Sequence, residues 1–293
     1  ETGGRAVIVI SSHVVRGTVG SRASVFALEA MGLPVWAVPT VVLPWHPGQG
    51  RGVRITPSAE EFSALLADLS NAPWLGEVGA VFSGYLGGEG QAQAVAQLVQ
   101  AVRAKNPQAI YLCDPVIGDV GGLYVPEATA IAARDLLLPL ADIATPNRFE
   151  LEWLVQEKLA DNDAIIRVAP RLGPPTLLAT SAYASSAGSI GNLLVTSRET
   201  VLVEHRAIAN APRGTGDLVA SLFLGRLLGG QNKTDSLRMA TASVFEVVAR
   251  AVKRGSDELM LETDASSLLH PMAMVQMHRF SHRPAGPDDG VSA

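Results

Sequence analysis

The run Arg213-Gly214-Thr215-Gly216-Asp217 contains the residues of this chain that are best suited to chemistry. Its glycines let the backbone approach a ligand closely, and a helix starting here would point free N–H groups at the same spot, so we expect a bound anion. A carboxylate is repelled by a phosphate, yet Asp217 at a helix start is placed to accept a proton from a hydroxyl during phosphate transfer. A turn followed by an ordinary Asp N-cap explains the same residues equally well.

Two other polar segments follow apolar, strand-like runs. They are residues 114–119, Asp-Pro-Val-Ile-Gly-Asp, and residues 145–150, Thr-Pro-Asn-Arg-Phe-Glu. Open α/β sheets bind ligands outside the carboxyl ends of their strands, which is where these residues are expected. Asp114, Asp119 and Glu150 offer oxygen ligands for Mg²⁺ or a monovalent cation beside phosphates. Either segment alone is better explained as an ordinary loop, because Asp-Pro and Pro-Asn are common loop dipeptides.

The hydrophobic pattern predicts the elements that must position these residues. Apolar runs alternate with helical periodicity, which indicates a mainly parallel sheet covered by helices. Residues 192–196 and 200–205 predict a hairpin that gives the sheet an antiparallel edge. The expected strands span 6–11, 35–41, 80–83, 110–114, 143–145 and 176–180, and the expected helices span 20–31, 58–69, 89–105, 126–138, 148–156, 217–228, 233–254 and 257–269.

The composition favours one large domain that acts on small molecules. Of the 293 residues, 47% are hydrophobic and 17% are charged, so the chain can bury a large core. No linker interrupts the α/β pattern; we therefore expect a single domain over 5–280, followed by a disordered tail over 281–293. The net charge of −5 argues against nucleic acid or an anionic membrane as a partner, and no apolar run is long enough to span a bilayer.

Other motifs narrow the class of protein. Cys113 is the single cysteine and cannot form an internal disulfide, which fits the reducing cytoplasm. The chain lacks Gly-x-x-x-x-Gly-Lys-Ser/Thr and has no Gly-x-Gly-x-x-Gly after its first strand, so a P-loop nucleotidase and a Rossmann dehydrogenase are disfavoured. The six histidines show no metal-binding spacing.

Over about residues 7–254, the chain resembles the pyridoxal kinases of the ribokinase-like superfamily. Gly-Thr-Gly-Asp indicates only the superfamily, whereas Ser-His-Val-Val and Ser-Gly-Tyr-Leu-Gly are much narrower and favour the pyridoxal branch. The resemblance implies a three-layer α/β/α ribokinase-like fold and a homodimer. The matching segments are residues 12–17, His46, and residues 83–87, 113–119, 145–150, 180–181 and 214–217.

The resemblance also implies an activity, the ATP-dependent phosphorylation of the 5′-hydroxyl of pyridoxal to pyridoxal 5′-phosphate in vitamin B6 salvage. Asp217 would take the hydroxyl proton, while the amides of Gly214, Thr215 and Gly216 would stabilise charge on the transferred phosphoryl group. The residues implied for pyridoxal are Ser12, Val19, His46 and Tyr85. The residues implied for ATP are Asp114, Asn147, Glu150, Thr180, Ser181, Gly214 and Thr215. The resemblance also implies Mg²⁺ or another divalent cation, and K⁺ or Na⁺, with Asp114, Asp119, Thr145 and Glu150 as the metal-binding residues.

The chain departs from the family pattern at two places. Pro47 stands where close relatives often carry Thr, which removes a hydroxyl from the substrate side. Residues 120–125 are shorter than the usual phosphate-covering lid and contain no Cys, although their glycine pair still provides hinge freedom. Residues 184–191 are expected to form a flexible loop near the nucleotide.

Two other functions stay open. Hydroxymethylpyrimidine kinases share Gly-Thr-Gly-Asp, but Ser12 and Tyr85 favour a pyridine ring. A non-catalytic pyridoxal phosphate carrier could keep the same fold, but such a binder would not need Asp217 opposite the phosphate.

Overall fold

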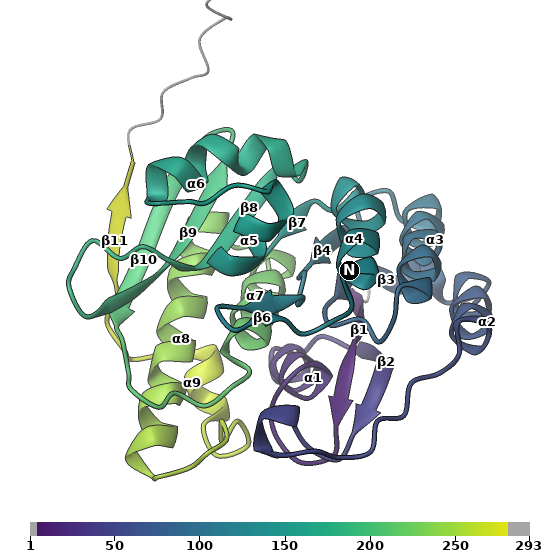
Figure 1. The fold of residues 1–293 in the computed structure, drawn as a ribbon, viewed down its shortest axis with the longest axis horizontal. Coiled ribbons are helices and arrows are strands. Elements are labelled where there is room, and N and C mark those ends of the chain that lie inside the picture. Colours follow the sequence, from purple (N-terminus) through teal and green to yellow (C-terminus); the bar gives the residue numbers. More distant parts are fainter. Residues whose placement is uncertain (1–4, 281–293) are drawn as a thin grey trace, which may run out of the picture.

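The computed structural model describes residues 5–280 and confirms the expected three-layer α/β/α fold (Figure 1). One nine-stranded sheet forms the central layer, and a short hairpin stands apart from it. The strands of the large sheet are β1 (Ala6–Val14), β2 (Val35–Leu43), β3 (Val78–Ser83), β4 (Ile110–Cys113), β7 (Ile143–Ala144), β8 (Thr176–Ala182), β9 (Ser189–Thr196), β10 (Thr200–Arg206) and β11 (Gln276–Arg279), and the hairpin pairs β5 (Gly118–Asp119) with β6 (Gly122–Leu123).

The sheet is parallel on one side and antiparallel on the other. Its strand order is β11-β10-β9-β8-β7-β4-β3-β1-β2. The six strands from β2 to β8 run parallel, and β9, β10 and β11 each run antiparallel to the strand before them. The predicted hairpin is therefore present, but it does not form the edge, because β11 pairs outside β10.

Helices cover both faces of the sheet, because alternate side chains of its strands point to opposite cores. In β1, Ile8 and Ile10 face one core, while Val7 and Val9 face the other, and all four are fully buried. The first core is covered by α2 (Ala59–Ser70), α3 (Gly90–Lys105), α4 (Glu127–Ala132), α5 (Arg148–Val155) and α6 (Asn162–Val168), and the second by α1 (Ser21–Ala30), α7 (Thr215–Leu228), α8 (Lys233–Lys253) and α9 (Ala265–Leu269).

The strand order reverses next to β1. The chain leaves β1, forms β2 on one side, and returns to form β3 on the other side. Crossovers on either side of such a point diverge, which opens a crevice at the carboxyl ends of the strands. At this point the β3 end is tied to β1, since Gly84 N donates to Ile10 O over 2.8 Å and Tyr85 N donates to Ser11 Oγ over 3.2 Å.

The prediction of a helix over 257–269 is wrong for most of its length. Only α9 is helical there, and residues 257–264 form bends, a turn and irregular backbone. Gly255, with φ 70°, lies just after α8, and the side chains of Asp257 and Glu258 reach across to Arg16 and Thr18. Long-range hydrogen bonds therefore override the local helical pattern.

Other elements were not predicted. Helix α6 and strand β11 lie in segments without a clear sequence pattern, and the helix expected over 126–138 is regular only in α4, before a π-helical turn at Ala133–Leu137. The loop expected over 184–191 is shorter because β9 begins at Ser189. Glu204 also holds this loop, accepting hydrogen bonds from Ser185 N and Ser186 Oγ over 2.6 and 2.7 Å.

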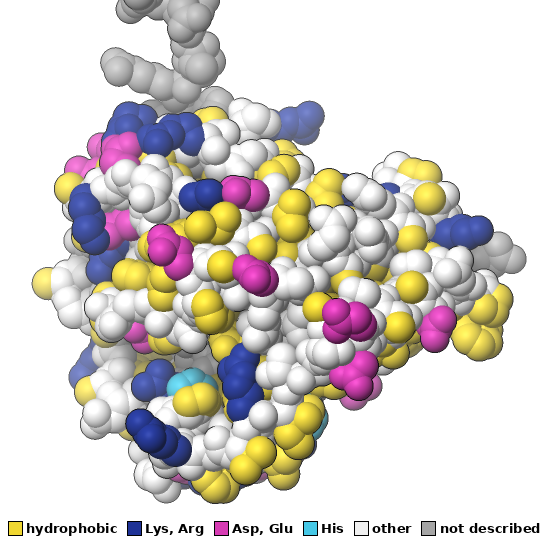
Figure 2. All heavy atoms as spheres, turned by 45° about the vertical axis from the view of Figure 1, so that its right-hand side comes forward, with side chains coloured by type: hydrophobic (Ala, Val, Ile, Leu, Met, Phe, Trp, Pro, Cys, Tyr) yellow, Lys and Arg dark blue, Asp and Glu magenta, His cyan; other side chains and the backbone are white. Residues whose placement is uncertain are grey.

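The expected tail over 281–293 lies outside the described residues, and the single-domain boundary at 280 stays a prediction. None of the helices within residues 5–280 combines the length and apolar character needed to cross a membrane. On the face drawn in Figure 2, basic and acidic side chains are interspersed over the surface.

Candidate active site

The start of α7 presents backbone amides that no side chain of its N-cap residue covers. Gly214 is the N-cap, with φ 92°, and it makes no side-chain cap. The first N–H groups of a helix have no partner within the helix, so those of α7 are available to an anion. A Cβ atom on Gly214 would lie 2.1 Å from the carbonyl oxygen of Thr18. Both the left-handed conformation and this close contact require glycine.

Asp217 lies in the first turn of α7 and faces the loop after β1. Its Oδ2 accepts a hydrogen bond from Gly20 N over 2.9 Å. Burial disfavours the charged carboxylate and raises its pKa to about 6, even though the Gly20 N–H favours the charged form. Asp217 is therefore mostly ionised at neutral pH and can accept a proton.

The residues predicted for the substrate ring surround the same loop. Gly20 packs against Ser12, since a Cβ on Gly20 would lie 2.3 Å from Ser12 Oγ. Val19 belongs to a small apolar cluster of the β1 and β2 ends, against which Tyr85 packs. The structure thus brings Ser12, Val19 and Tyr85 together beside Asp217.

The Tyr85 side chain is held at both its hydroxyl and its ring. Arg54 Nη1 donates to the Tyr85 hydroxyl over 2.9 Å, and its guanidinium carbon lies 5.5 Å from the ring centroid. The backbone oxygen of Tyr85 accepts from Thr40 Oγ1 over 2.7 Å. These contacts fix a half-buried aromatic ring, which suits packing on a flat substrate.

A second set of predicted residues forms a hydrogen-bonded group at the ends of β4, β7 and β8. Thr145 Oγ1 donates to Asp114 Oδ1 over 2.9 Å, and both side chains are buried. Asn147 and Glu150 form the capping box that starts α5, and Asn147 also forms a parallel bridge with Thr180. The structure therefore brings Asp114, Thr145, Asn147, Glu150 and Thr180 together.

Asp114 and Glu150 each have a raised pKa, caused by burial and by the charge of a neighbouring carboxylate. Burial and the nearby charge of Asp217 raise the pKa of Asp114 to about 8. Burial and the charge of Asp114 also raise the pKa of Glu150, although the backbone N–H groups of Asn147, Gly118 and Ile117 favour its charged form. A positive counter-ion would relieve this repulsion.

Asp114 and Glu150 can supply only a few of the ligands that a bound cation needs. Within residues 5–280, no group of three or more His, Cys, Asp or Glu side chains could hold a metal ion. Both Glu150 oxygens already accept backbone hydrogen bonds, Oε1 from Ile117 and Oε2 from Asn147. Asp114 and Glu150 therefore fit a cation whose other ligands are phosphate oxygens and water.

The side chains of two other predicted residues form no hydrogen bond with this group in the described part of the chain. Asp119 is half-buried at the β5–β6 hairpin, where it accepts hydrogen bonds from the Tyr124 hydroxyl and from Gly121 N. The first of these bonds is the main cause of its lowered pKa. Ser181 is exposed and has a left-handed backbone, with φ 53°. Their roles near the phosphates stay predictions.

A cavity of about 270 Å³ opens beside Val19 and His46. His46 Nδ1 accepts a hydrogen bond from Gly48 N over 2.9 Å, and burial followed by the charge of Arg213 lowers the pKa of His46. The remaining lining residues are Gln49, Asn210, Ala211, Pro212, Arg213, Asp257 and Glu258.

The sequence analysis singled out the run that begins at Arg213 but assigned no role to Arg213 itself. Arg213 lines the cavity beside His46, and its positive charge contributes to lowering the pKa of both His46 and Asp119. Arg213 is exposed, and it forms no ion pair with another residue in the described part of the chain. A cation directly before Gly-Thr-Gly-Asp was the available signal in the sequence.

Comparisons with known proteins agree with this geometry. Residues 55–262 match the family model described as phosphomethylpyrimidine kinase. The pyridoxal kinase PdxY of Rubrobacter xylanophilus is 36% identical over 95% of this chain and 99% of that protein. The pyridoxine/pyridoxal/pyridoxamine kinase of Bordetella bronchiseptica is also 36% identical, over 87% of this chain and 92% of its own.

A solved structure extends the similarity to the fold. The pyridoxal kinase from Leishmania donovani, in complex with ADP and pyridoxamine, matches with a TM-score of 0.88 and 26% identity. The match covers 94% of this chain and 100% of that one. With relatives this similar over nearly their whole length, the chain belongs to the pyridoxal kinase family of the ribokinase-like superfamily.

Proposed function

We propose that this protein transfers the γ-phosphoryl group of ATP to the 5′-hydroxyl of pyridoxal, giving pyridoxal 5′-phosphate and ADP in vitamin B6 salvage. The observation that carries the proposal is Asp217, a carboxylate with a raised pKa next to the uncovered amides of α7. A base and an anion site in direct contact are what phosphoryl transfer to a hydroxyl requires. The named pyridoxal kinases to which the chain is similar support the choice of substrate.

In this reaction Asp217 accepts the proton of the 5′-hydroxyl while the hydroxyl oxygen forms a bond to phosphorus and ADP leaves. Negative charge is spread over the oxygens of the transferred group, and the amides of Gly214, Thr215 and Gly216 stabilise it. Because these amides belong to a packed helix, they need little rearrangement as the charge moves. Most of the catalysis is thus positioning and electrostatic stabilisation.

The pyridine ring is proposed to bind between the loop after β1 and Tyr85. Ser12 would hydrogen-bond the ring, Val19 and Tyr85 would pack on it, and His46 would line the pocket. Pro47 offers no hydroxyl to the substrate, so this wall contributes shape rather than a further hydrogen bond.

ATP is proposed to lie along the ends of β4, β7 and β8. Asn147, Thr180 and Ser181 would contact the nucleotide, and Asp114 and Glu150 would hold Mg²⁺ or another divalent cation, with Thr145 and Asp119 nearby. When bound, such a cation neutralises phosphate charge. Glu150 and Thr145 are also the proposed neighbours of a K⁺ or Na⁺ ion. The hairpin with Gly121 and Gly122 is proposed to close over the phosphates.

A hydroxymethylpyrimidine kinase is the second candidate, because the matching family model is that of phosphomethylpyrimidine kinase. The fixed Tyr85 ring and the curated relatives favour pyridoxal. A carrier without turnover is disfavoured, since it would have no use for a base that contacts the anion site.

We also propose that the protein works in the cytoplasm as a homodimer. An exposed apolar patch supports the dimer: Val15, Trp45, Val53 and Ile55 have exposed fractions of 65, 37, 72 and 63%. They are neighbours at the end of β2, because Val15 N bonds to Leu43 O and Ile55 pairs with Val42. Exposed apolar patches mark association sites. The cytoplasmic location rests on the single cysteine, Cys113, which cannot form an internal disulfide.

Substrate and base are tested together. With ATP and Mg²⁺, turnover is expected with pyridoxal and its amine and alcohol analogues, and much less with hydroxymethylpyrimidine or ribose. Asp217→Asn should lower kcat by about 10²- to 10⁴-fold, because the base is lost. Product is measured by its absorbance, and nucleotide Kd by calorimetry should be unchanged. Equal loss of both would make Asp217 structural, and tight pyridoxal phosphate binding without wild-type turnover would favour the carrier.

The repulsion among the carboxylates predicts a pH-dependent stability. The pKa of Asp114 is about 8 in the folded protein, against an ordinary value of 3.8. The stability that the folded protein gains by keeping Asp114 protonated is therefore complete below pH 4 and is lost as the pH rises through 8. Asp114→Asn cannot ionise, and its unfolding free energy relative to wild type should rise by up to about 1.4 kcal/mol per pH unit over this window. Urea denaturation without nucleotide or cation measures it. Asp119→Asn is the control, since the lowered pKa of Asp119 should change stability only at acid pH. A pH-independent difference for Asp114→Asn would contradict the assignment.

Arg213 is proposed to contact the phosphoryl group beside the α7 amides. Arg213→Met should lower kcat/KM by about 10- to 100-fold, the worth of one charge-assisted hydrogen bond. Arg213→Lys, which keeps the charge, should recover part of the loss. Arg198→Met, in the turn between β9 and β10, is the matched control. Unchanged kinetics in Arg213→Met would remove Arg213 from the site.

The dimer is tested by sedimentation velocity, which should give about twice the chain mass of 30.7 kDa. Ile55→Glu places a charge in the exposed patch and should shift the protein toward monomer. Trp74→Glu changes another exposed apolar residue, 61% accessible, and should leave the mass unchanged. A monomeric wild type, or equal effects of both variants, would refute the interface.

A further inference from the structure

We propose that Glu258, in the turn between α8 and α9, is a positioning residue for phosphoryl transfer: it holds the loop after β1 against the start of α7. This loop, residues 15–20, is called the substrate loop below. The inference rests on the proposed function, since it concerns the geometry of the same site. Neither the sequence pattern nor the resemblance pointed to Glu258.

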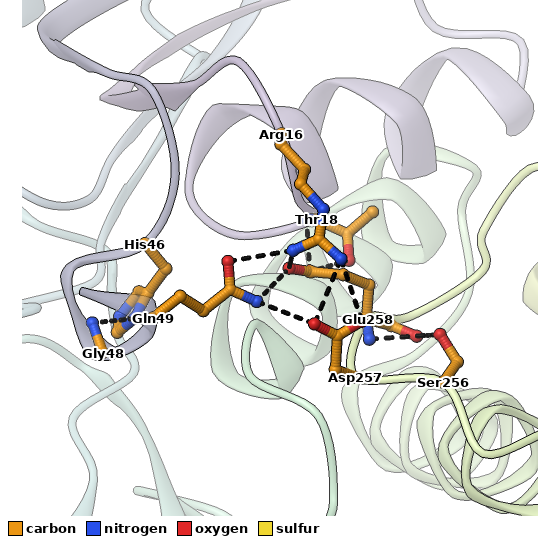
Figure 3. Close-up of polar contacts among 8 residues, drawn as sticks. All are labelled: Arg16, Thr18, His46, Gly48, Gln49, Ser256, Asp257 and Glu258. Carbon is orange, nitrogen blue, oxygen red and sulfur yellow. Dashed lines mark hydrogen bonds and ion pairs between the residues drawn. The ribbon is translucent and has the colours of Figure 1, made fainter. Parts of the chain in front are cut away.

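The substrate loop contacts the Glu258 carboxylate at Gly17 and Thr18, and Figure 3 shows Thr18 beside Glu258. Oε2 accepts hydrogen bonds from Thr18 N over 3.1 Å and from Thr18 Oγ1 over 3.4 Å. Gly17 has φ 113°, and a Cβ atom there would lie 3.0 Å from both carboxylate oxygens. The loop conformation therefore leaves room for this carboxylate and for no side chain at position 17.

The opposite side of the same loop contacts the start of helix α7. The carbonyl oxygen of Thr18 lies against Gly214, and the N–H of Gly20 bonds to Asp217. Thr18 is thus held by Glu258 through its N–H and touches the anion site through its carbonyl. A shift of this residue would change the position of Gly20 relative to Asp217, and small displacements of reacting groups lower rates strongly.

Glu258 also links the substrate loop to the segment that carries His46. Its Oε1 accepts hydrogen bonds from Gln49 Nε2 over 2.8 Å and from Arg16 Nη1 over 3.3 Å. Arg16 in turn donates to Gln49 Oε1 over 3.0 Å. The substrate loop and the segment that carries His46 and Gln49 are therefore both hydrogen-bonded to the Glu258 carboxylate, as Figure 3 shows.

Burial distinguishes Glu258 from its neighbour Asp257. The Glu258 side chain is 17% exposed, whereas Asp257 is 65% exposed and Arg16 is 55% exposed. Ion pairs between exposed side chains contribute little, so the Arg16–Asp257 pair is not expected to fix the loop. The hydrogen bonds from Thr18 to a mostly buried carboxylate are the stronger constraint.

The test compares Glu258→Ala with two matched variants. Glu258→Gln keeps an oxygen that can accept from Thr18 N, and Glu262→Ala removes an exposed glutamate four positions along the same turn. Steady-state kinetics with pyridoxal and with ATP, calorimetric Kd for pyridoxal, and thermal unfolding are measured for all three. The split between the two substrates is the readout that general destabilisation would not produce.

Glu258→Ala is expected to raise KM and Kd for pyridoxal and to lower kcat, with kcat/KM falling by at least about tenfold, while KM for ATP stays unchanged. Glu258→Gln should remain within about threefold of wild type, because the acceptor is kept, and Glu262→Ala should match wild type. If Glu258→Ala does not fold, Glu258→Asp, whose shorter side chain retreats from Thr18, should show the same split.

Three results would overturn the proposal: unchanged pyridoxal constants in a folded Glu258→Ala, equal losses for pyridoxal and ATP, or the same effect in Glu262→Ala. Absence of wild-type turnover with pyridoxal is a different outcome, because it refutes the proposed function itself. Turnover in wild type combined with a normal Glu258→Ala refutes only the role of Glu258.

Discussion

The site depends on the contact between the loop after β1 and the first turn of α7. Gly214 lies so close to the Thr18 carbonyl that no side chain fits between them, and Gly20 donates its N–H to Asp217. These two contacts join the start of the first strand crossover to a helix almost two hundred residues later in the chain. The base, the anion site and the substrate loop are therefore in direct contact, above the core that α1 and α7 share.

Charge is the second constraint on the site. Burial favours the neutral forms of Asp217, Asp114 and Glu150, and the charge of a neighbouring carboxylate adds to this effect at Asp114 and Glu150. Such an arrangement costs stability in the empty protein, and it is a common feature of functional sites. Positive charge brought by the cation that accompanies the nucleotide would compensate it, which couples nucleotide binding to the ionisation of the carboxylates.

Much of the fold and part of the site could be predicted from the sequence because their signals are local. Alternating strand and helix patterns gave the parallel half of the sheet, and Gly214 and Asp217 were singled out by the residues around them. By contrast, Glu258 carries no local pattern. Glu258 binds a residue 240 positions away, and its segment has a helical periodicity that the structure does not follow. Strand β11 was missed for a similar reason, since its short and exposed sequence becomes a strand only by pairing with β10.

The glycine contacts of the substrate loop also determine where new specificity can arise. Positions 20 and 214 are closed to any side chain, because a Cβ atom would strike Ser12 or Thr18 at 2.3 or 2.1 Å. The segment around His46 and Gln49 has exposed positions and borders an open cavity. The segment around His46 and Gln49 is therefore the part of the site where substitutions can change substrate range without disturbing the contact between the loop after β1 and α7.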